Sequence, residues 1–381
     1  MAEPVSASIV EHFHTLEDPR LARTRKHNLL DILVIALCTL LTGGEGFQDM
    51  ALFGQTKRAW LQTFLALPHG IPSHDTFGRV FARLHPQRFQ ACFLAWTRAV
   101  ADLTQGALIS LDGKTVKASL DRATAASPLH MVSAWCSENS GLVLGQVKTD
   151  TKSNEITAIP ELLQLLAIKG CLVTIDAMGC QTAIARQIRD QEGDYLLALK
   201  KNHRKAYKEI KQYFHAHIEH HIAWRTRENF FDAFDDEHGR LVRRRVWTMT
   251  DFTTLSALAK WPDLRTVIVV ESIRTAHVDA PTTSHYRFFL SSLRRSATAF
   301  MTMIRQHWHI ENRLHWSLDV TFNEDRCRIR KDHAAENMVV LRHVALNLLR
   351  QEQAQPMSIR RKRLRCSLDE RYLLTVISGA T

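Results

Sequence analysis

Cysteine is scarce in this chain, and its placement excludes the frameworks that cysteines usually build. Seven cysteines are scattered over 381 residues, their number is odd, and none has the C-x-x-C spacing. Neither a zinc ribbon nor a disulfide framework is therefore indicated. A reducing compartment such as the cytosol fits this cysteine usage best.

Long apolar runs and sorting signals are missing as well. The most apolar stretch, residues 32–41, falls far short of the roughly 20 residues that a membrane span needs. The first residues, Met-Ala-Glu-Pro, lack the basic segment and apolar core of a secretory signal. We therefore expect a buried helix at residues 32–41, a cytoplasmic protein and no membrane partner.

Acidic residues are in the minority. Asp and Glu number 39 against 50 Lys and Arg, which gives a net charge of +11 and a pI near 9.5. This balance favours a polyanionic partner such as DNA, although it says nothing about the fold. The H-E-x-x-H, G-x-x-x-x-G-K-[ST] and G-x-G-x-x-G signatures are absent, so zinc peptidase chemistry and nucleotide-binding loops are disfavoured.

Helical periodicity runs through residues 29–103, with breaks at 42–44 and 68–72. After the second break, Ser73 or Asp75 can cap a helix whose apolar face comprises Phe77, Val80, Phe81 and Leu84. We predict an all-helical N-terminal domain, residues 1–104, that binds DNA. Its arginines suit DNA binding but could equally form an ordinary solvated face.

Strand patterns take over beyond residue 106. Strands are expected at 107–112, 129–135, 142–148, 171–176 and 194–199, with helices at 153–166 and 181–189 before the last two strands. The order β-β-β-α-β-α-β predicts an α/β fold with a ribonuclease H-like mixed-sheet core, residues 105–350. A β-rich insertion at about 200–295 is expected within it, with strands at 224–236, 240–249 and 266–274. Residues 351–381 would form a basic C-terminal tail.

Two of the predicted strands end in a carboxylate. Asp112 and Asp176 each follow an apolar run and each have a glycine within three residues. A carboxylate at the end of a buried strand is costly unless a cation meets it, and a metal ion is one such cation. Each Asp could instead cap the turn that follows, but two in one pattern favour a shared site.

A third carboxylate is expected on a helix at residues 298–318. There His307, Glu311 and His315 are spaced four residues apart and would share one face. Glu311 is preferred as a ligand because an unpaired carboxylate among Trp, Ile and His would be expensive, although Arg305 or Arg313 could also pair with it. The alternatives for the third ligand are Asp319, Glu324 and Asp325.

Three carboxylates form an all-oxygen ligand set. Such a set suits Mg²⁺ or Mn²⁺, which are hard ions that keep several waters. Two ions roughly 3.5–4 Å apart could activate an attacking oxygen and neutralise the leaving 3′-oxygen of a phosphodiester. The carboxylates therefore predict metal-dependent phosphodiester chemistry.

Four segments resemble the ISAs-type insertion-sequence transposases, also called H-repeat-associated proteins. They are residues 111–115, 152–160, 173–181 and 307–312, and the likeness extends to residues 18–20 and 71–77 in the helical N-terminal part. The resemblance spans nearly the whole chain. It implies a DNA transposase in which Asp112, Asp176 and Glu311 are the DDE metal ligands, with the β-rich insertion ahead of the last catalytic helix.

The resemblance also implies the reaction and the partners. Hydrolysis at the element ends would free a 3′-hydroxyl, which then attacks target DNA in a strand transfer. Transposon ends and target DNA would be the partners, a homodimer would hold two ends, and the protein would act at the bacterial nucleoid. A metal-dependent nuclease with the same core and an inactive domesticated DNA-binding protein are the alternative functions.

The chain departs from related families at one motif. Those families have Y-x-x-R-x-x-x-E-x-x-x-x-x-x-K around the catalytic Glu, whereas this chain has Ile304, His307 and Leu318 at the Tyr, Arg and Lys positions. The DNA contacts of that Tyr, Arg and Lys therefore do not carry over. Candidates for local substitutes in DNA contact are His307, Asn312, His315, Arg328 and Arg330, which could equally be structural. From charge and from proximity to the motifs, phosphate contacts are predicted for Lys114, Lys117, Lys200, Lys201, Arg204, Arg328 and Arg330.

Overall fold

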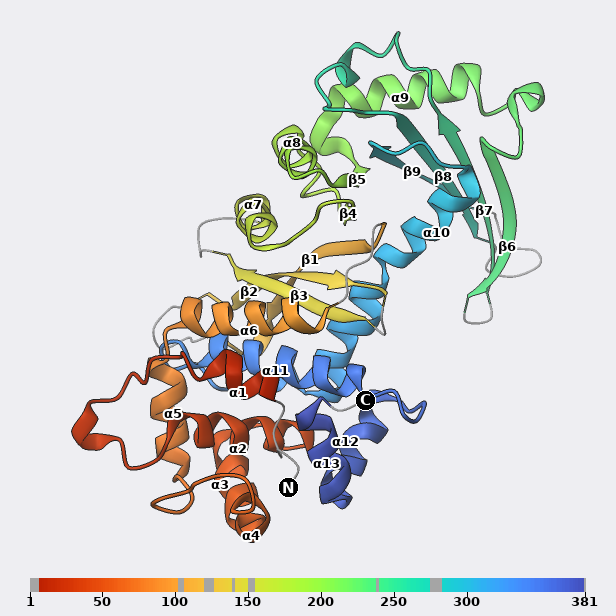
Figure 1. The fold of residues 1–381 in the computed structure, drawn as a ribbon. Coiled ribbons are helices and arrows are strands. Elements are labelled where there is room, and N and C mark those ends of the chain that lie inside the picture. The colour runs from red at the N-terminus through yellow and green to blue at the C-terminus, as the bar shows by residue number, and fades with distance from the viewer. Residues whose placement is uncertain are drawn as a thin grey trace. The chain divides into compact units, whose positions relative to one another are not determined.

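The computed structural model describes residues 7–101, 106–119, 127–138, 141–149, 155–237, 240–274 and 283–379 (Figure 1). In these ranges the chain is a mixed α/β protein with a large mixed sheet and many helices, which confirms the predicted fold class at this level. Residues 1–102, 113–153 and 310–381 form one compact unit, and residues 103–112 and 154–309 form a second. This division is based on compactness and does not test function. The functional domains predicted at 1–104, 105–350 and 351–381 therefore stay predictions.

The first unit starts with helices that share one apolar core. They are α1 (Ala7–Phe13), α2 (Leu29–Leu41), α3 (Phe47–Thr56), α4 (Arg58–Leu61), α5 (His74–Arg83) and α6 (Pro86–Val100). The Ser73 hydroxyl accepts a hydrogen bond from Thr76 N at 3.3 Å and so caps α5, as predicted. The predicted apolar face is fully buried at Phe77, Val80, Phe81 and Leu84. None of the described helices is both long and apolar enough to cross a membrane.

The first unit also contains the C-terminal helices. They are α11 (Ala334–Gln351), which is buried over most of its length, α12 (Ile359–Leu368) and α13 (Glu370–Ser378). The run predicted as a basic tail therefore includes two helices with buried cations. Lys362 Nζ donates a hydrogen bond to Leu349 O at 2.8 Å, and Arg363 Nε donates one to Leu40 O at 2.9 Å. These two charges are thus used inside the protein.

Strands β1 (Leu108–Val116), β2 (Leu129–Cys136) and β3 (Leu142–Lys148) follow one another in the sheet in the order β3-β2-β1. The strands predicted at 129–135 and 142–148 are confirmed, and they pair antiparallel as a hairpin. Strand β1 is longer than predicted, because residues beyond Asp112 are also buried: Val116 packs in an apolar cluster with Met131 and Val339. Asp112 therefore lies within a strand rather than at its end, and the boundary between the units falls just after it.

The second unit contains parallel strands that lead to Asp176. Strand β1 pairs in parallel with β4 (Leu172–Ile175), and β4 pairs in parallel with β5 (Asp194–Leu199). With α7 (Glu155–Leu165) and α8 (Thr182–Asp190), the chain order is the predicted β-β-β-α-β-α-β. Leu111 pairs with Ile175, so Asp112 and Asp176 each follow directly on paired residues of neighbouring strands.

Four antiparallel strands continue the sheet of the second unit. The order from β1 is β1-β4-β5-β9-β8-β7-β6, where β6 is Phe230–Glu237, β7 is Arg240–Met249, β8 is Thr266–Arg274 and β9 is Thr283–Ser291. Helix α9 (Arg204–His217) lies across these strands (Figure 1), with Phe214 packed edge-on against Trp247. Helix α10 (Ala297–His307) follows β9.

Two features of these strands differ from the prediction. Strand β9 was not predicted, because four of its first five residues are exposed and only Phe288–Ser291 reads as an apolar run. Strand β6 begins at Phe230 and not at residue 224. A turn precedes it, in which Thr226 N donates to Asn229 Oδ1 at 2.6 Å. The later start of β6 comes from polar residues that satisfy their backbone locally.

Candidate metal centre

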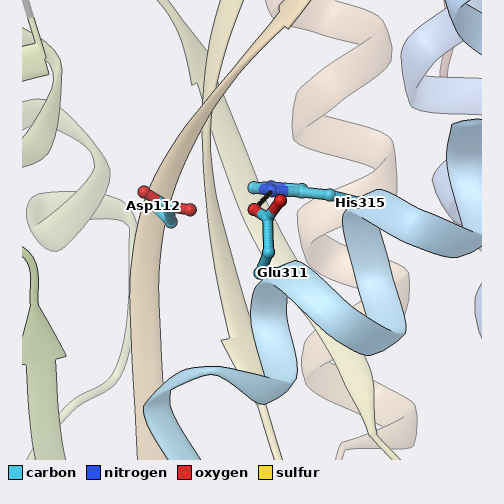
Figure 2. Close-up of side chains that lie close together, drawn as sticks. All are labelled: Asp112, Glu311 and His315. Atoms are coloured by element: carbon cyan, nitrogen blue, oxygen red, sulfur yellow. Dashed lines mark hydrogen bonds and ion pairs between the residues drawn. The ribbon is translucent and has the colours of Figure 1, made fainter. Parts of the chain in front are cut away.

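Glu311 and His315 lie one turn apart on a π-helical segment. The chain leaves α10 and continues as π-helical segments at Ile310–His315 and Ser317–Thr321. His315 Nδ1 lies 3.0 Å from Glu311 Oε2 (Figure 2), so the predicted shared face is confirmed for this pair. The hydrogen bond from His315 lowers the pKa of Glu311, so the carboxylate is ionised and held in one orientation near neutral pH.

Asp112 adds a second carboxylate to this pair. Asp112, Glu311 and His315 each offer one ligand atom, and these three atoms lie within 4.8 Å of one another (Figure 2). Asp112 adjoins Gly113 of the first unit directly along β1. Two carboxylates and an imidazole fit Mn²⁺, and they fit Mg²⁺ if His315 orients Glu311 without itself binding the ion.

Glu311 has no competing ion pair in the described part of the chain apart from His315. The sequence had left Arg305 and Arg313 as possible partners, and neither forms a salt bridge with Glu311. Its side chain is 57% exposed, whereas that of His315 is 6% exposed. The carboxylate is therefore accessible while the group that orients it is fixed in the interior.

Asp176 begins the loop after β4. One of its carboxylate oxygens accepts a hydrogen bond from Met178 N at 2.9 Å, so Asp176 does cap its own turn. Gly179 is required in this loop because a Cβ there would lie 2.3 Å from the Ile175 side chain. The loop is thus tightly packed. Asp176 is half-buried beside Asp112 in the register of β1 and β4, and it is not a member of the group around Glu311.

A cavity of about 490 Å³ opens beside Asp176 in the second unit. Its lining is mainly apolar and aromatic, and it includes Lys200 and Lys201, two of the predicted DNA contacts. Asn202 Nδ2 donates to Ala177 O at 2.7 Å and ties this lysine segment to the loop after β4. The structure therefore brings both lysines together with Asp176.

His307 does not belong to the face formed by Glu311 and His315. Its Nδ1 lies 2.9 Å from Thr174 Oγ1 of β4, and Thr174 in turn donates to Ser110 Oγ at 3.2 Å. Burial lowers the pKa of His307 to about 4, so the ring is neutral near pH 7. His307 therefore anchors the end of α10 to the strand that leads to Asp176.

A second acidic cluster surrounds Lys114 of β1. Its Nζ lies 2.7 Å from Asp319, 2.9 Å from Glu324 and 3.3 Å from Asp325, and the side chain is 8% exposed. Glu324 is 1% exposed and also lies 3.5 Å from Arg342. Burial acts to raise the pKa of Glu324, but the charges of Lys114 and Arg342 outweigh it and lower that pKa.

This cluster bears on two predictions. The sequence left Asp319, Glu324 and Asp325 as alternative third ligands, and all three contact Lys114. Lys114 itself was a predicted phosphate contact, which would require these ion pairs to open. The sequence patterns did not predict this cluster. Its one signal was the crowding of three acids within residues 319–325, opposite in charge to the lysine.

The other predicted DNA contacts are exposed. Lys117 is 77% exposed, and its Nζ lies 2.7 Å from Asp325. Asn312 lies on the π-helical segment, Arg204 begins α9, and Arg328 lies in the irregular segment that precedes α11. Arg330 is in that same segment. These residues come from four parts of the fold, so their joint action on DNA stays a prediction.

A mixed sheet with carboxylates on its central strands, in a chain of net charge +11, is typical of metal-dependent enzymes that act on nucleic acid phosphodiesters. Residues 104–348 match the protein family described as "Transposase DDE domain", and residues 10–97 match the one described as "DDE_Tnp_1-associated". The chain therefore belongs to the DDE transposase family.

Named relatives agree with this assignment. The chain is 36% identical over 375 residues to "H repeat-associated putative transposase YhhI" of Escherichia coli K12, an alignment that covers 98% of both chains. It is 36% identical over 377 residues to "Putative transposase YncI" of Escherichia coli O157:H7, covering 98% of this chain and 95% of the relative. An "Uncharacterized protein in dhlA 3'region" of Xanthobacter autotrophicus is 42% identical over 266 residues, 69% of this chain and 87% of the relative. The predicted likeness to H-repeat-associated transposases is confirmed.

Proposed function

We propose that this chain is an active DNA transposase that holds two divalent ions, Mg²⁺ or Mn²⁺, with Asp112, Asp176 and Glu311. The observation that carries the proposal is the position of Asp112. It neighbours Asp176 through the register of β1 and β4, and it shares a ligand group with Glu311 and His315. Asp112 on β1 thus links the other two carboxylates of the proposed set, Asp176 and Glu311.

Bound ions would supply an activated attacking oxygen and would neutralise charge on the leaving 3′-oxygen. The residues of the chain orient these events. His315 orients Glu311, and Lys200 and Lys201 contact the phosphates of the strand held beside Asp176. Hydrolysis at an element end leaves a 3′-hydroxyl, which then attacks a target phosphodiester. One phosphodiester forms as another breaks, so no external energy source is needed.

The proposed organisation follows the same reading. Residues 105–350 act as a ribonuclease H-like catalytic core with a β-rich insertion, which the order β-β-β-α-β-α-β supports. Residues 1–104 act as a helical DNA-binding domain, with the basic residues of 351–381 at the other end of the chain. The active species is a homodimer at the bacterial nucleoid, because strand transfer of both ends requires that two DNA ends be held together.

The test is divalent-ion-dependent cleavage and joining of duplex DNA that carries the sequences flanking the gene. Full-length protein is compared with Asp176→Asn, which removes the charge but keeps the shape, and with Asp190→Asn at the end of α8 as a matched control. We expect cleavage and joining to vanish only in Asp176→Asn, while DNA binding persists. Cleavage without joining would identify a nuclease, and binding without cleavage in both Mg²⁺ and Mn²⁺ would identify an inactive DNA-binding protein.

A further inference from the structure

A polar groove of about 700 Å³ lies in the first unit, apart from the residues of the metal centre. Helix α5 forms one wall, the start of α3 forms another, and residues 326–331 form the third. Four cationic side chains line it: Arg79, Arg326, Arg328 and Lys331. The groove therefore has the charge and the concave shape of a site for an anionic partner.

Residues 326–331 are held in place from both ends. Before them, Glu324 is buried and paired with Lys114 at 2.9 Å. After them, Asn337 of α11 is fully buried, and its Nδ2 donates to Phe81 O at 2.8 Å and to Leu84 O at 3.0 Å at the end of α5. The segment is thus fixed against α5 by the protein itself, so the groove is preorganised.

Three cations of this segment lack internal partners, whereas Arg330 Nε donates a hydrogen bond to Ala118 O at 2.9 Å. Within the described residues, no side-chain hydrogen bond or ion pair is formed by Arg326, Arg328 or Lys331, and all three are exposed. The carboxylate of Asp49, by contrast, is used to cap α3, where it accepts hydrogen bonds from Glu45 N at 2.8 Å and Gly46 N at 3.0 Å. The lining also includes Glu45, whose carboxylate accepts a hydrogen bond from Asn323 Nδ2 at 3.1 Å. Positive charge in the groove is therefore available to a ligand, while two of its three carboxylates are held by hydrogen bonds within the protein.

One carboxylate in the groove remains open to solvent. Asp75, in the first turn of α5, is 73% exposed, and it lies 3.4 Å from the adjacent His74. A free carboxylate among cations weakens binding to phosphate in general. It can, however, accept a hydrogen bond from the exocyclic amino group of cytosine in the major groove. This combination suits a surface that distinguishes bases as well as one that holds a backbone.

We propose that this groove reads the DNA sequence of the element ends. Arg79, Arg328 and Lys331 contact phosphates, and α5 presents Asp75 to base edges in the major groove. The inference rests on the proposed function, because it names the surface by which the same protein recognises its DNA. It differs from it in substance, because it concerns sequence discrimination and requires neither metal nor cleavage.

The test measures binding of full-length protein to two duplexes of equal length and composition, in EDTA, by fluorescence anisotropy. One duplex carries the sequence flanking the gene and the other is scrambled. We expect Arg328→Ala to weaken both by a similar factor and to reduce the salt slope by about 1. We expect Asp75→Ala to lower the ratio of the two affinities by about 5-fold or more, while binding to the scrambled duplex is unchanged or tighter.

The control is Lys260→Ala, an exposed cation of the second unit outside the groove. The proposal is overturned if Arg328→Ala behaves like Lys260→Ala, or if Asp75→Ala changes both affinities equally. Circular dichroism of each variant shows whether the helices remain folded. If Asp75→Ala does not fold, the test is repeated with Asp75→Asn, which keeps the shape of the side chain. The binding assay contains no divalent ion and therefore no cleavage. It tests only the proposal on sequence discrimination, and the cleavage assay tests only the catalytic proposal.

Discussion

Glu311 and Glu324, both in the first unit, each belong to an acidic cluster, and the electrostatic environments of the two carboxylates are opposite. Glu311 is 57% exposed and is oriented by His315, whereas Glu324 is 1% exposed and lies against Lys114 and Arg342. Among the described residues, the Glu311 carboxylate has no permanent counter-charge in contact, whereas Glu324 is neutralised by the protein. The comparison teaches that the number of acids does not identify a metal site. A candidate metal site is identified by carboxylates that no protein cation already neutralises, because a neutralised carboxylate gains little by binding an ion.

The largest expected effect breaks the open cluster. Glu311→Gln removes the negative charge and keeps the shape, so we expect cleavage to fall on the order of 10²-fold to 10³-fold, since a group that stabilises charge in the transition state is lost. The free energy of unfolding should change by less than about 0.5 kcal/mol, because the side chain is largely exposed. Cleavage rates and urea unfolding measure both quantities. Undiminished cleavage would remove Glu311 from the metal centre.

The next effect breaks the neutralised cluster. Glu324→Gln leaves Arg342 buried without the carboxylate that faces it, so we expect the free energy of unfolding to drop by about 3 kcal/mol or more. Urea unfolding is compared with that of Glu161→Gln, an exposed residue of α7 that should leave the midpoint unchanged. If Glu324→Gln and Glu161→Gln lower the free energy of unfolding equally, the buried ion pair of Glu324 does not contribute to stability.

The sequence was informative where the signal is local. Apolar runs followed by Asp predicted β1, which carries Asp112, and β4, which ends just before Asp176. The parallel pairing of Leu111 with Ile175 makes these two acids neighbours. The i, i+4 spacing placed Glu311 beside His315, although the helix there is π and not α, because this spacing suits both.

The neutralised cluster had no comparable local signal. Lys114 and Glu324 are 210 residues apart in the chain, so no periodicity or motif connects them. The same holds for Asn337, which fixes α5 from α11 more than 250 residues away. The sequence therefore identified the candidate acidic ligands, and only the tertiary fold determined which of them are already paired.

Acid sensitivity should sharpen the comparison, because the neutralised cluster also contains a buried histidine. Burial lowers the pKa of His343 to about 4, against 6.5 for an ordinary histidine. Protons then bind the unfolded chain first, so stability from this group is present above pH 6.5 and is lost as the pH falls towards 4. His343→Phe, which keeps a ring against Phe93, should reduce the fall in unfolding temperature between pH 7 and pH 4.5.

The control for this prediction is His285→Phe, an exposed position on β9. It should leave the pH dependence as it is in the unchanged protein. His307, whose pKa is also lowered to about 4, should keep part of the acid sensitivity in both variants. An identical pH slope in His343→Phe and the unchanged protein would mean that His343 is not neutral in the folded state.

The smallest effect compares two lysines that share one carboxylate. Lys114 and Lys117 both contact Asp325, but Lys114 is 8% exposed and Lys117 is 77% exposed. Lys117→Met should leave the urea midpoint where it is, because solvent already screens an exposed ion pair, whereas Lys114→Met should lower it clearly. If Lys117 contacts phosphate as predicted, the same variant should reduce the salt slope of DNA binding by about 1. A shifted urea midpoint in Lys117→Met would show that both lysines stabilise Asp325. Lys117 would then belong to the neutralised cluster.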